Sequence, residues 1–127
     1  MTAPNWIETA VRDFGRGAGL ENFALNGRGV AAVRFESGIS LRFEYALGEL
    51  VVAMTVPVAN TPETARRILA YSHPDARYGA KVRAGYLAKP GCAVFAVRQA
   101  SEDVTLPVIN TVFGALWRVA TEAGGAA

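Results

Sequence analysis

The sequence predicts an α+β fold in which an antiparallel sheet is packed by helices, in the order α-β-β-β-α-β-β-α. Three observations carry this prediction. Stretches in which apolar and polar residues alternate, typical of half-buried strands, recur along the 127 residues. Apolar stripes at helical spacing stand before, between and after them. No Pro/Ser-rich linker divides the chain, which indicates a single domain over residues 1–123 and a frayed tail over 124–127.

The three predicted helices begin at residues that favour helix starts. The first spans 4–16, with a proline in its first turn, where the missing N–H costs nothing. The second begins at 61–63 with a threonine, a proline and a glutamate, and must end near Ser72 because Pro74 follows. The last begins at Asp103 or Thr105. Their apolar stripes are Ile7, Ala10, Val11 and Phe14; Ala65, Ile68 and Leu69; and Ile109, Val112, Phe113, Leu116, Trp117 and Ala120.

Five strands are predicted, at 30–36, 39–45, 50–56, 81–88 and 92–99. The second has the clearest alternation, with its apolar residues facing a covered side. The third is apolar on both sides, which is unusual for a strand with one face in water. The residues predicted to point inward from the first three are Ala31, Val33 and Phe35; Ile39, Leu41, Phe43 and Tyr45; and Leu50, Val52, Met54 and Val56.

Three glycines within residues 15–19 resemble a phosphate-binding loop. Such loops follow a strand and open a helix, whereas this segment closes the first predicted helix. The segment is therefore interpreted as a helix C-cap followed by a turn.

Charge and cysteine content indicate the class of protein and its compartment. The net charge is +2 with eleven arginines and two lysines, and the isoelectric point is near 9.0. These basic residues are spread along the chain, so they are weak evidence for nucleic-acid binding. The single Cys92 excludes an internal disulfide and predicts a reducing, cytoplasmic setting. The longest apolar stretch, 50–59, is about half of what a membrane span needs, and the first residues do not resemble a signal peptide.

Side chains that carry catalysis are nearly absent. The one histidine, His73, precedes Pro74 at a helix end, and Cys92 starts a strand, so neither is predicted to be a nucleophile or a base. No cysteine or histidine pair has metal-ligand spacing. Residues 102–103 are acidic and are interpreted as helix-start residues. The sequence predicts no catalytic residue, no metal and no cofactor.

Nucleic-acid binding by the sheet is an alternative. Arg34 and Arg42 are predicted to point outward, but Phe35, Phe43 and Tyr45 are predicted to point into the core. The outer face would then lack the aromatic side chains on which RNA-binding sheets stack bases.

The order of elements resembles the type III secretion chaperones of the CesT/SycE-like class, which are small dimeric proteins that hold secreted effectors before export. The resemblance spans nearly the whole chain and depends on order and spacing more than on any short motif. Its local traces are Phe14-Gly15 with Gly19-Leu20, Ser37-Gly38 with Leu41 and Phe43, the helix started by Pro62, and Leu106-Pro107 before Trp117. Chaperones of this class are typically acidic, and this chain is basic.

The resemblance implies a bacterial, cytoplasmic homodimer that binds an extended, N-proximal segment of an effector without catalysis. In this family the middle helix and the following strand pair the subunits. Here they correspond to Ala65, Ile68, Tyr71, Val82, Ala84 and Tyr86. The alternative is that Ile68 and Leu69 only cover their own sheet.

Partner binding is expected on the exposed side of the first helix and on the outer face of the sheet. The candidate contacts are Trp6, Arg34, Arg42, Val51, Ala53 and Thr55. Three other interpretations stay open: a basic nucleic-acid-binding module, a ligand-binding or regulatory domain of similar topology, and an enzyme.

Overall fold

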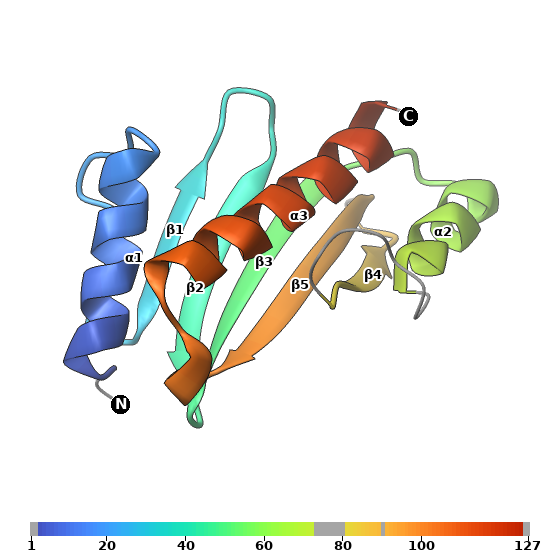
Figure 1. Ribbon diagram of the computed structural model, residues 1–127. Coiled ribbons are helices and arrows are strands. Elements are labelled where there is room, and N and C mark those ends of the chain that lie inside the picture. The colour runs from blue at the N-terminus through green and yellow to red at the C-terminus, as the bar shows by residue number, and fades with distance from the viewer. Residues whose placement is uncertain (1–2, 73–80, 90, 126–127) are drawn as a thin grey trace.

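The computed structural model describes residues 3–72, 81–89 and 91–125, and it confirms the predicted order of helices and strands (Figure 1). His73, predicted to lie in a turn, falls outside the described residues. Two short 3-10 helices add to the predicted elements. The elements are α1 (Asn5–Gly17), β1 (Val30–Arg34), β2 (Ser40–Ala46), β3 (Glu49–Pro57), α2 (Pro62–Leu69), η1 (Ala70–Ser72), β4 (Arg83–Leu87), β5 (Cys92–Ala100), η2 (Ser101–Asp103) and α3 (Leu106–Gly125).

The five strands form one antiparallel sheet in the order β1-β2-β3-β5-β4. The long strands β3 and β5 therefore lie side by side at its centre, although α2 and β4 separate them along the chain. β1 and β4 are the two edges. The register of the central pair places Ala53 opposite Ala96 and Met54 opposite Phe95.

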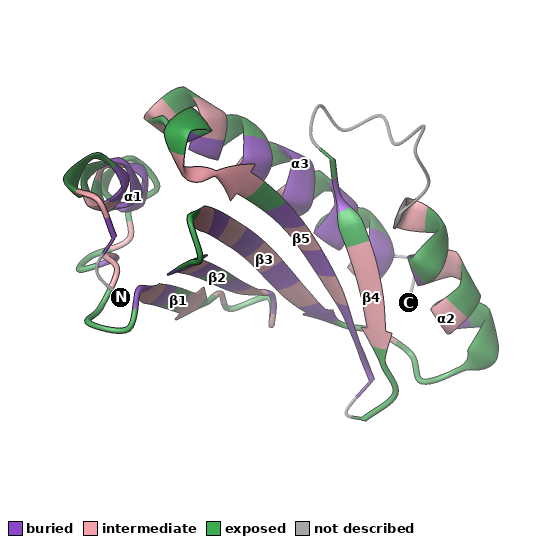
Figure 2. Ribbon diagram, turned by 90° about the horizontal axis from the view of Figure 1, so that it is seen from below, coloured by how far each residue is buried: buried purple, intermediate pink, exposed green. Residues whose placement is uncertain are grey.

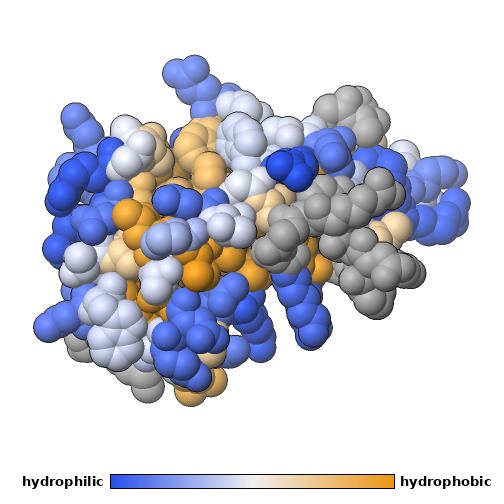
Figure 3. All heavy atoms as spheres, in the orientation of Figure 1, coloured by the Kyte–Doolittle hydropathy of each residue, from blue (hydrophilic) through white to orange (hydrophobic). Residues whose placement is uncertain are grey.

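The helices cover one face of the sheet and leave the other open. In Figure 2, α1 and α3 lie above the sheet, α2 lies beside β4, and no labelled helix lies below the sheet. The inward residues predicted for β2 and β3 are buried, with Leu41, Phe43 and Leu50 fully enclosed. Figure 3, which views the helix side, shows orange apolar atoms between the helices with blue residues around them. The core therefore lies between this helix layer and the inner sheet face.

An aromatic cluster joins α1 to α3 across this core. The ring of Phe14 stacks on Phe43 with 5.3 Å between centroids, and lies 5.1 Å from the ring of Phe113. Trp117 stacks on Phe113 at 5.9 Å and meets the edge of Phe35 at 5.5 Å. Offset and edge-on contacts of this kind each add about 0.5–1.5 kcal/mol beyond the burial of area. The cluster fixes the position of both helices on the sheet.

The glycine segment after α1 is a helix C-cap, as predicted. Gly19 has a φ of 75°, and its N–H donates to the carbonyl of Arg16, while the N–H of Leu20 donates to the carbonyl of Gly15. These two bonds form a Schellman motif, which needs a left-handed residue where glycine has no steric cost. The motif turns the chain back along α1 and lets Phe23 pack directly against Gly15.

Gly15→Ala is expected to lower the free energy of unfolding by about 1–3 kcal/mol, because overpacking strains a filled core. A β-carbon on Gly15 would lie 2.7 Å from Cβ of Phe23 and 3.1 Å from its carbonyl oxygen. Gly17→Ala is the matched control: nothing lies within 4 Å of its added carbon, and alanine favours helix by up to about 1 kcal/mol. Urea unfolding of both variants checks this. Equal losses of stability in the two would contradict the close packing at Gly15.

The start of α3 decides between the two predicted starts, and its last turn packs against the sheet. Of the two predicted starts for the last helix, Thr105 is the cap, since its Oγ1 accepts a bond from the N–H of Val108 at 3.2 Å. Asp103 lies in η2 instead. The helix continues through Gly125. The fully buried Ala123 and the close approach of Gly124 to Val56 show that this last turn packs against the sheet.

Candidate functional site

The described residues hold no candidate metal-binding cluster. Within residues 3–72, 81–89 and 91–125, no group of three histidine, cysteine, aspartate or glutamate side chains could hold a metal ion. Cys92 is a free, buried thiol. No described helix is long and apolar enough to cross a membrane.

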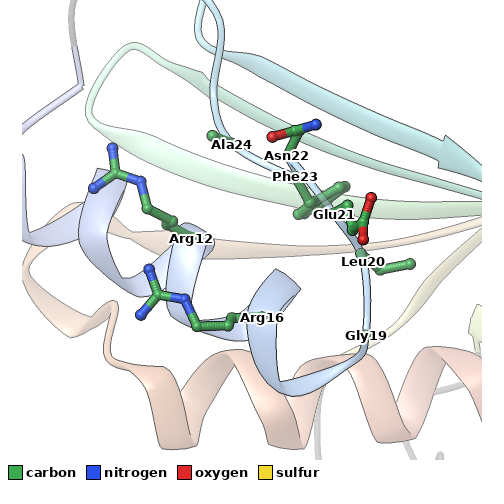
Figure 4. A pocket seen from close by; sticks show the side chains of 8 residues that line it. All are labelled: Arg12, Arg16, Gly19, Leu20, Glu21, Asn22, Phe23 and Ala24. Carbon is green, nitrogen blue, oxygen red and sulfur yellow. The ribbon is translucent and has the colours of Figure 1, made fainter.

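An open pocket of about 610 Å³ lies between α1 and residues 19–24 (Figure 4). Arg12 and Arg16 project from successive turns of the helix, and Glu21 lies on the facing segment. All three charged residues are exposed, and Arg16 also approaches Asp13 at 3.7 Å. The pocket is a solvated hollow left by the C-cap turn, and none of its charged groups is buried.

The open face of the sheet combines a centre of small and apolar residues with arginines on both sides. Strand pairing aligns Arg42, Ala53, Ala96 and Arg83 in one row across four strands. The neighbouring row, which starts at Arg34, consists of Arg34, Ser40, Thr55, Val94 and Gly85. The central residues of both rows are half-buried, and the arginines are exposed. We call this surface the outer face.

The charges on the outer face are unequally paired. Arg42 lies 3.3 Å from Glu44, and Arg98 lies 3.8 Å from Glu49, both as exposed ion pairs. Arg34 and Arg83 form no ion pair with the rest of the described chain. Exposed pairs are worth at most about 1 kcal/mol, so a partner can replace them at low cost. The outer face therefore has an excess of positive charge available to a partner.

The edge of β1 has backbone groups that the sheet does not use. The N–H of Phe35 donates to Ile39, and the N–H of Tyr45 donates to Gly29, so the odd-numbered residues of β1 pair with β2. The even-numbered residues then point to the edge. Asn26 occupies the N–H and the carbonyl of the first of these, Val30. The backbone groups of the other two, Ala32 and Arg34, have no partner among the described residues. An extended segment could pair with them.

The structure brings five of the six predicted partner contacts together. Arg34, Arg42, Val51, Ala53 and Thr55 share the outer face. Trp6 lies apart from them on α1, and its Nε1–H donates to the carbonyl of Ser101 at 3.3 Å. Sequence reasoning missed the contribution of β4 and β5 to this face, namely Arg83, Gly85, Val94, Ala96 and Arg98.

The predicted interface residues do not all lie on the surface of the subunit. Ile68 is 0% exposed and Val82 is 3% exposed, both within the subunit's own core. Ile68 is thus enclosed within its own subunit, whereas Leu69, which the alternative placed with it, is 52% exposed. Tyr71 meets the edge of the Phe95 ring at 5.5 Å, and the hydroxyl of Tyr86 donates to Asn60 at 2.9 Å. Ala65, Tyr71, Ala84 and Tyr86 are half-buried.

Two exposed leucines that were not among the predicted interface residues lie on the elements predicted to pair the subunits. Leu69 on α2 is 52% exposed, and Leu87 on β4 is 51% exposed. Leu69 and Leu87, unlike Ile68, are therefore accessible on the surface of the subunit.

Several solved structures share this fold. A chain of the ExsC–ExsE complex superposes with a TM-score of 0.80 at 14% identity, covering 98% of this chain and 96% of that one. A chain of the complex between the Yersinia pestis type III secretion chaperone SycH and a stable fragment of YscM2 gives 0.71 at 18% identity, covering 92% and 98%. A chain of the HopA1–SchA chaperone–effector complex gives 0.71 at 14% identity, covering 94% of each. These likenesses confirm the α+β fold.

Sequence comparison identifies the family. No curated protein matches the chain. A family model, described as the type III secretory system chaperone SycN, matches residues 6–124 and so covers nearly the whole sequence. The protein therefore belongs to the SycN family of type III secretory system chaperones.

Proposed function

We propose that this protein binds an extended, N-proximal segment of a secreted effector in the bacterial cytoplasm, keeps it soluble and fit for export, and catalyses no reaction. The observation that carries the proposal is the outer face, which five strands build and no helix of the described chain covers. The family supports it, as does the likeness to a complex described as chaperone and effector.

The client segment would lie across the small, half-buried centre of the outer face. A neighbouring stretch of the same client would pair with the β1 edge in the plane of the sheet, where it would gain backbone hydrogen bonds from Ala32 and Arg34. Because Arg34 and Arg83 have no ion pair there, we expect acidic side chains on the client segment. A basic outer face would thus serve an acidic client, which accounts for the high isoelectric point.

Nucleic-acid binding has less support. None of the outward-facing residues of β1 to β5 is aromatic, so base stacking of the kind found on RNA-binding sheets has no platform on this face.

We also propose a homodimer that pairs through α2 and β4, with the half-buried Ala65, Tyr71, Ala84 and Tyr86 near the contact. Leu69 and Leu87 would be its apolar anchors, because both are about half exposed and lie on these two elements. Burying a leucine contributes about 1.5–3 kcal/mol. Because a two-fold interface uses the same surface of both subunits, each leucine contributes to it twice, once from each subunit. Ile68 and Val82 would support the contact from inside the core.

Co-expression with the product of the adjacent gene, followed by sizing and mass measurement, tests the function. We expect a complex of two chaperones and one client in which the N-proximal client segment resists protease. A monomer that binds no neighbouring protein would rule out the proposal.

Arg83→Glu is expected to weaken client binding by about tenfold, because a rim charge of the wrong sign repels an acidic segment. Arg118→Glu is the matched control, since it makes the same change at an exposed site on α3, in the helix layer. Titration at low and high salt checks this, with the difference shrinking as the Debye length falls to about 3 Å at 1 M. Equal effects of the two substitutions would contradict an acidic client on the outer face.

A further inference from the structure

A second exposed surface lies where the β2–β3 turn, η2 and the start of α1 meet, at the lower end of the molecule in Figure 1. Ser101 connects them. Its N–H donates to the carbonyl of Gly48 at 2.9 Å, and its carbonyl accepts from the indole N–H of Trp6 at 3.3 Å. Gly48, which follows Leu47, and Trp6 thus both bond to Ser101. Leu47 is 87% exposed and Trp6 is 55% exposed. We call this surface the Trp6–Leu47 surface.

Leu47 is unfavourable at its position in two ways: its backbone is left-handed, and its apolar side chain is exposed to water. The pairing of Ala46 with Glu49 makes Leu47 and Gly48 a two-residue hairpin turn, and their φ values are 53° and 76°. Such a turn needs left-handed backbone at both residues and favours Asn-Gly. An asparagine there would relieve strain and remove an exposed apolar side chain. A strained, exposed leucine at a turn is the kind of feature that a binding role retains.

Trp6 is held ready for contact. Its hydrogen bond to Ser101 fixes the orientation of the indole while about half of the residue stays in water. Tryptophan is among the residues enriched at the energetic centres of protein interfaces. A partner would therefore find its largest anchor already oriented.

The charge around this surface is acidic. Glu102 and Asp103, next to Ser101, are exposed and have no ion pair within the described chain. Glu49 follows the turn and has only a long, exposed contact with Arg98. This is opposite in sign to the outer face.

We propose that the Trp6–Leu47 surface docks a basic segment of a second protein, one that presents an apolar side chain between lysines or arginines. The apolar side chain packs against Trp6 and Leu47, and its basic neighbours meet Glu102 and Asp103. The surface borders the outer face at Glu49, but Trp6, Leu47, Glu102 and Asp103 are not part of that face, so docking and client binding can occur together. The proposal does not depend on the function proposed above.

The indole N–H resonances report on this site, because the chain has two tryptophans and Trp6→Phe identifies the exposed one. The probe is a short synthetic peptide in which leucine and phenylalanine are flanked by lysine and arginine. The control peptide has glutamate at each basic position. We expect the basic peptide to shift the Trp6 resonance and leave that of Trp117 in place. No shift, or an equal shift with the glutamate peptide, would overturn the proposal.

Leu47→Asn separates docking from a structural role. It should raise the midpoint of thermal unfolding or leave it unchanged, because asparagine suits the turn. It should also lower the affinity for the basic peptide by about tenfold or more. Lower stability with unchanged peptide affinity would show that Leu47 serves the fold and would overturn the proposal.

Two other occupants give distinct results. A Trp6 resonance that moves with protein concentration, without peptide, would assign the surface to a second copy of this chain. Loss of peptide binding in the client complex would assign it to the client. Either result overturns the proposal, whereas equal peptide binding by free and client-loaded protein supports it.

Discussion

Ile68→Asp is expected to destabilise the subunit severely, with a loss of about 4 kcal/mol or more in the free energy of unfolding. The side chain is fully enclosed among core residues, so the aspartate would be a buried charge without a partner, in addition to the lost apolar volume. Domains are stable by about 5–15 kcal/mol, so this change removes much of the margin. Circular dichroism and urea unfolding measure it.

Leu69→Asp, one residue along α2, is the matched comparison. Because Leu69 is half exposed, we expect the fold to persist with a loss below about 1 kcal/mol, while sizing shows monomers where the unmodified chain forms dimers. A dimer that survives this change would place the subunit contact outside α2. An Ile68→Asp chain with unchanged stability would contradict the burial of Ile68.

Ala53→Arg is expected to weaken client binding by about 100-fold while leaving the fold intact. Ala53 lies at the centre of the outer face, between Arg42 and Ala96. A long cationic side chain there would fill the space that the client backbone needs, and its charge would have to be desolvated on binding. A 100-fold loss of affinity corresponds to about 2.7 kcal/mol of binding free energy. Isothermal titration with the client segment measures the affinity, and thermal unfolding confirms the fold.

Ala46→Arg is the control for this substitution. Ala46 points to the same side of the sheet but lies at the exposed end of β2, so the same change there should alter client affinity by less than about threefold. Equal losses of client affinity in both variants would indicate a general effect of charge. A client that binds the Ala53→Arg variant with unchanged affinity would contradict binding at the outer face.

The sequence predicts those parts of the fold that depend on local patterns. The alternation through Leu41 and Phe43 identified the covered face of β2, and Thr105 was one of two predicted caps for α3. Burial of Ile68 was harder to predict. A stripe on a short helix shows that one side is apolar, but the stripe is the same whether its own sheet or a second subunit covers it.

The candidate site depends on contacts between distant segments. Residue spacing predicts that Val51, Ala53 and Thr55 lie on one side of a strand. It does not predict which strand lies beside them. β3 and β5 are separated along the chain by α2 and β4, so the row from Arg42 through Ala53 and Ala96 to Arg83 follows only from the register. The link between Trp6 and the turn at Gly48 through Ser101 likewise needs the placement of α1 against η2.

Amide hydrogen exchange at the β1 edge tests the central claim most directly. In the free chaperone, the amides of Ala32 and Arg34 point away from β2 and should exchange rapidly. In the client complex, a segment paired with this edge should slow their exchange strongly, with the inward-paired amides of Ala31 and Val33 as internal references. Unchanged exchange at Ala32 and Arg34 in a complex at saturation, with new protection confined to the helix layer, would contradict binding at the β1 edge and the outer face.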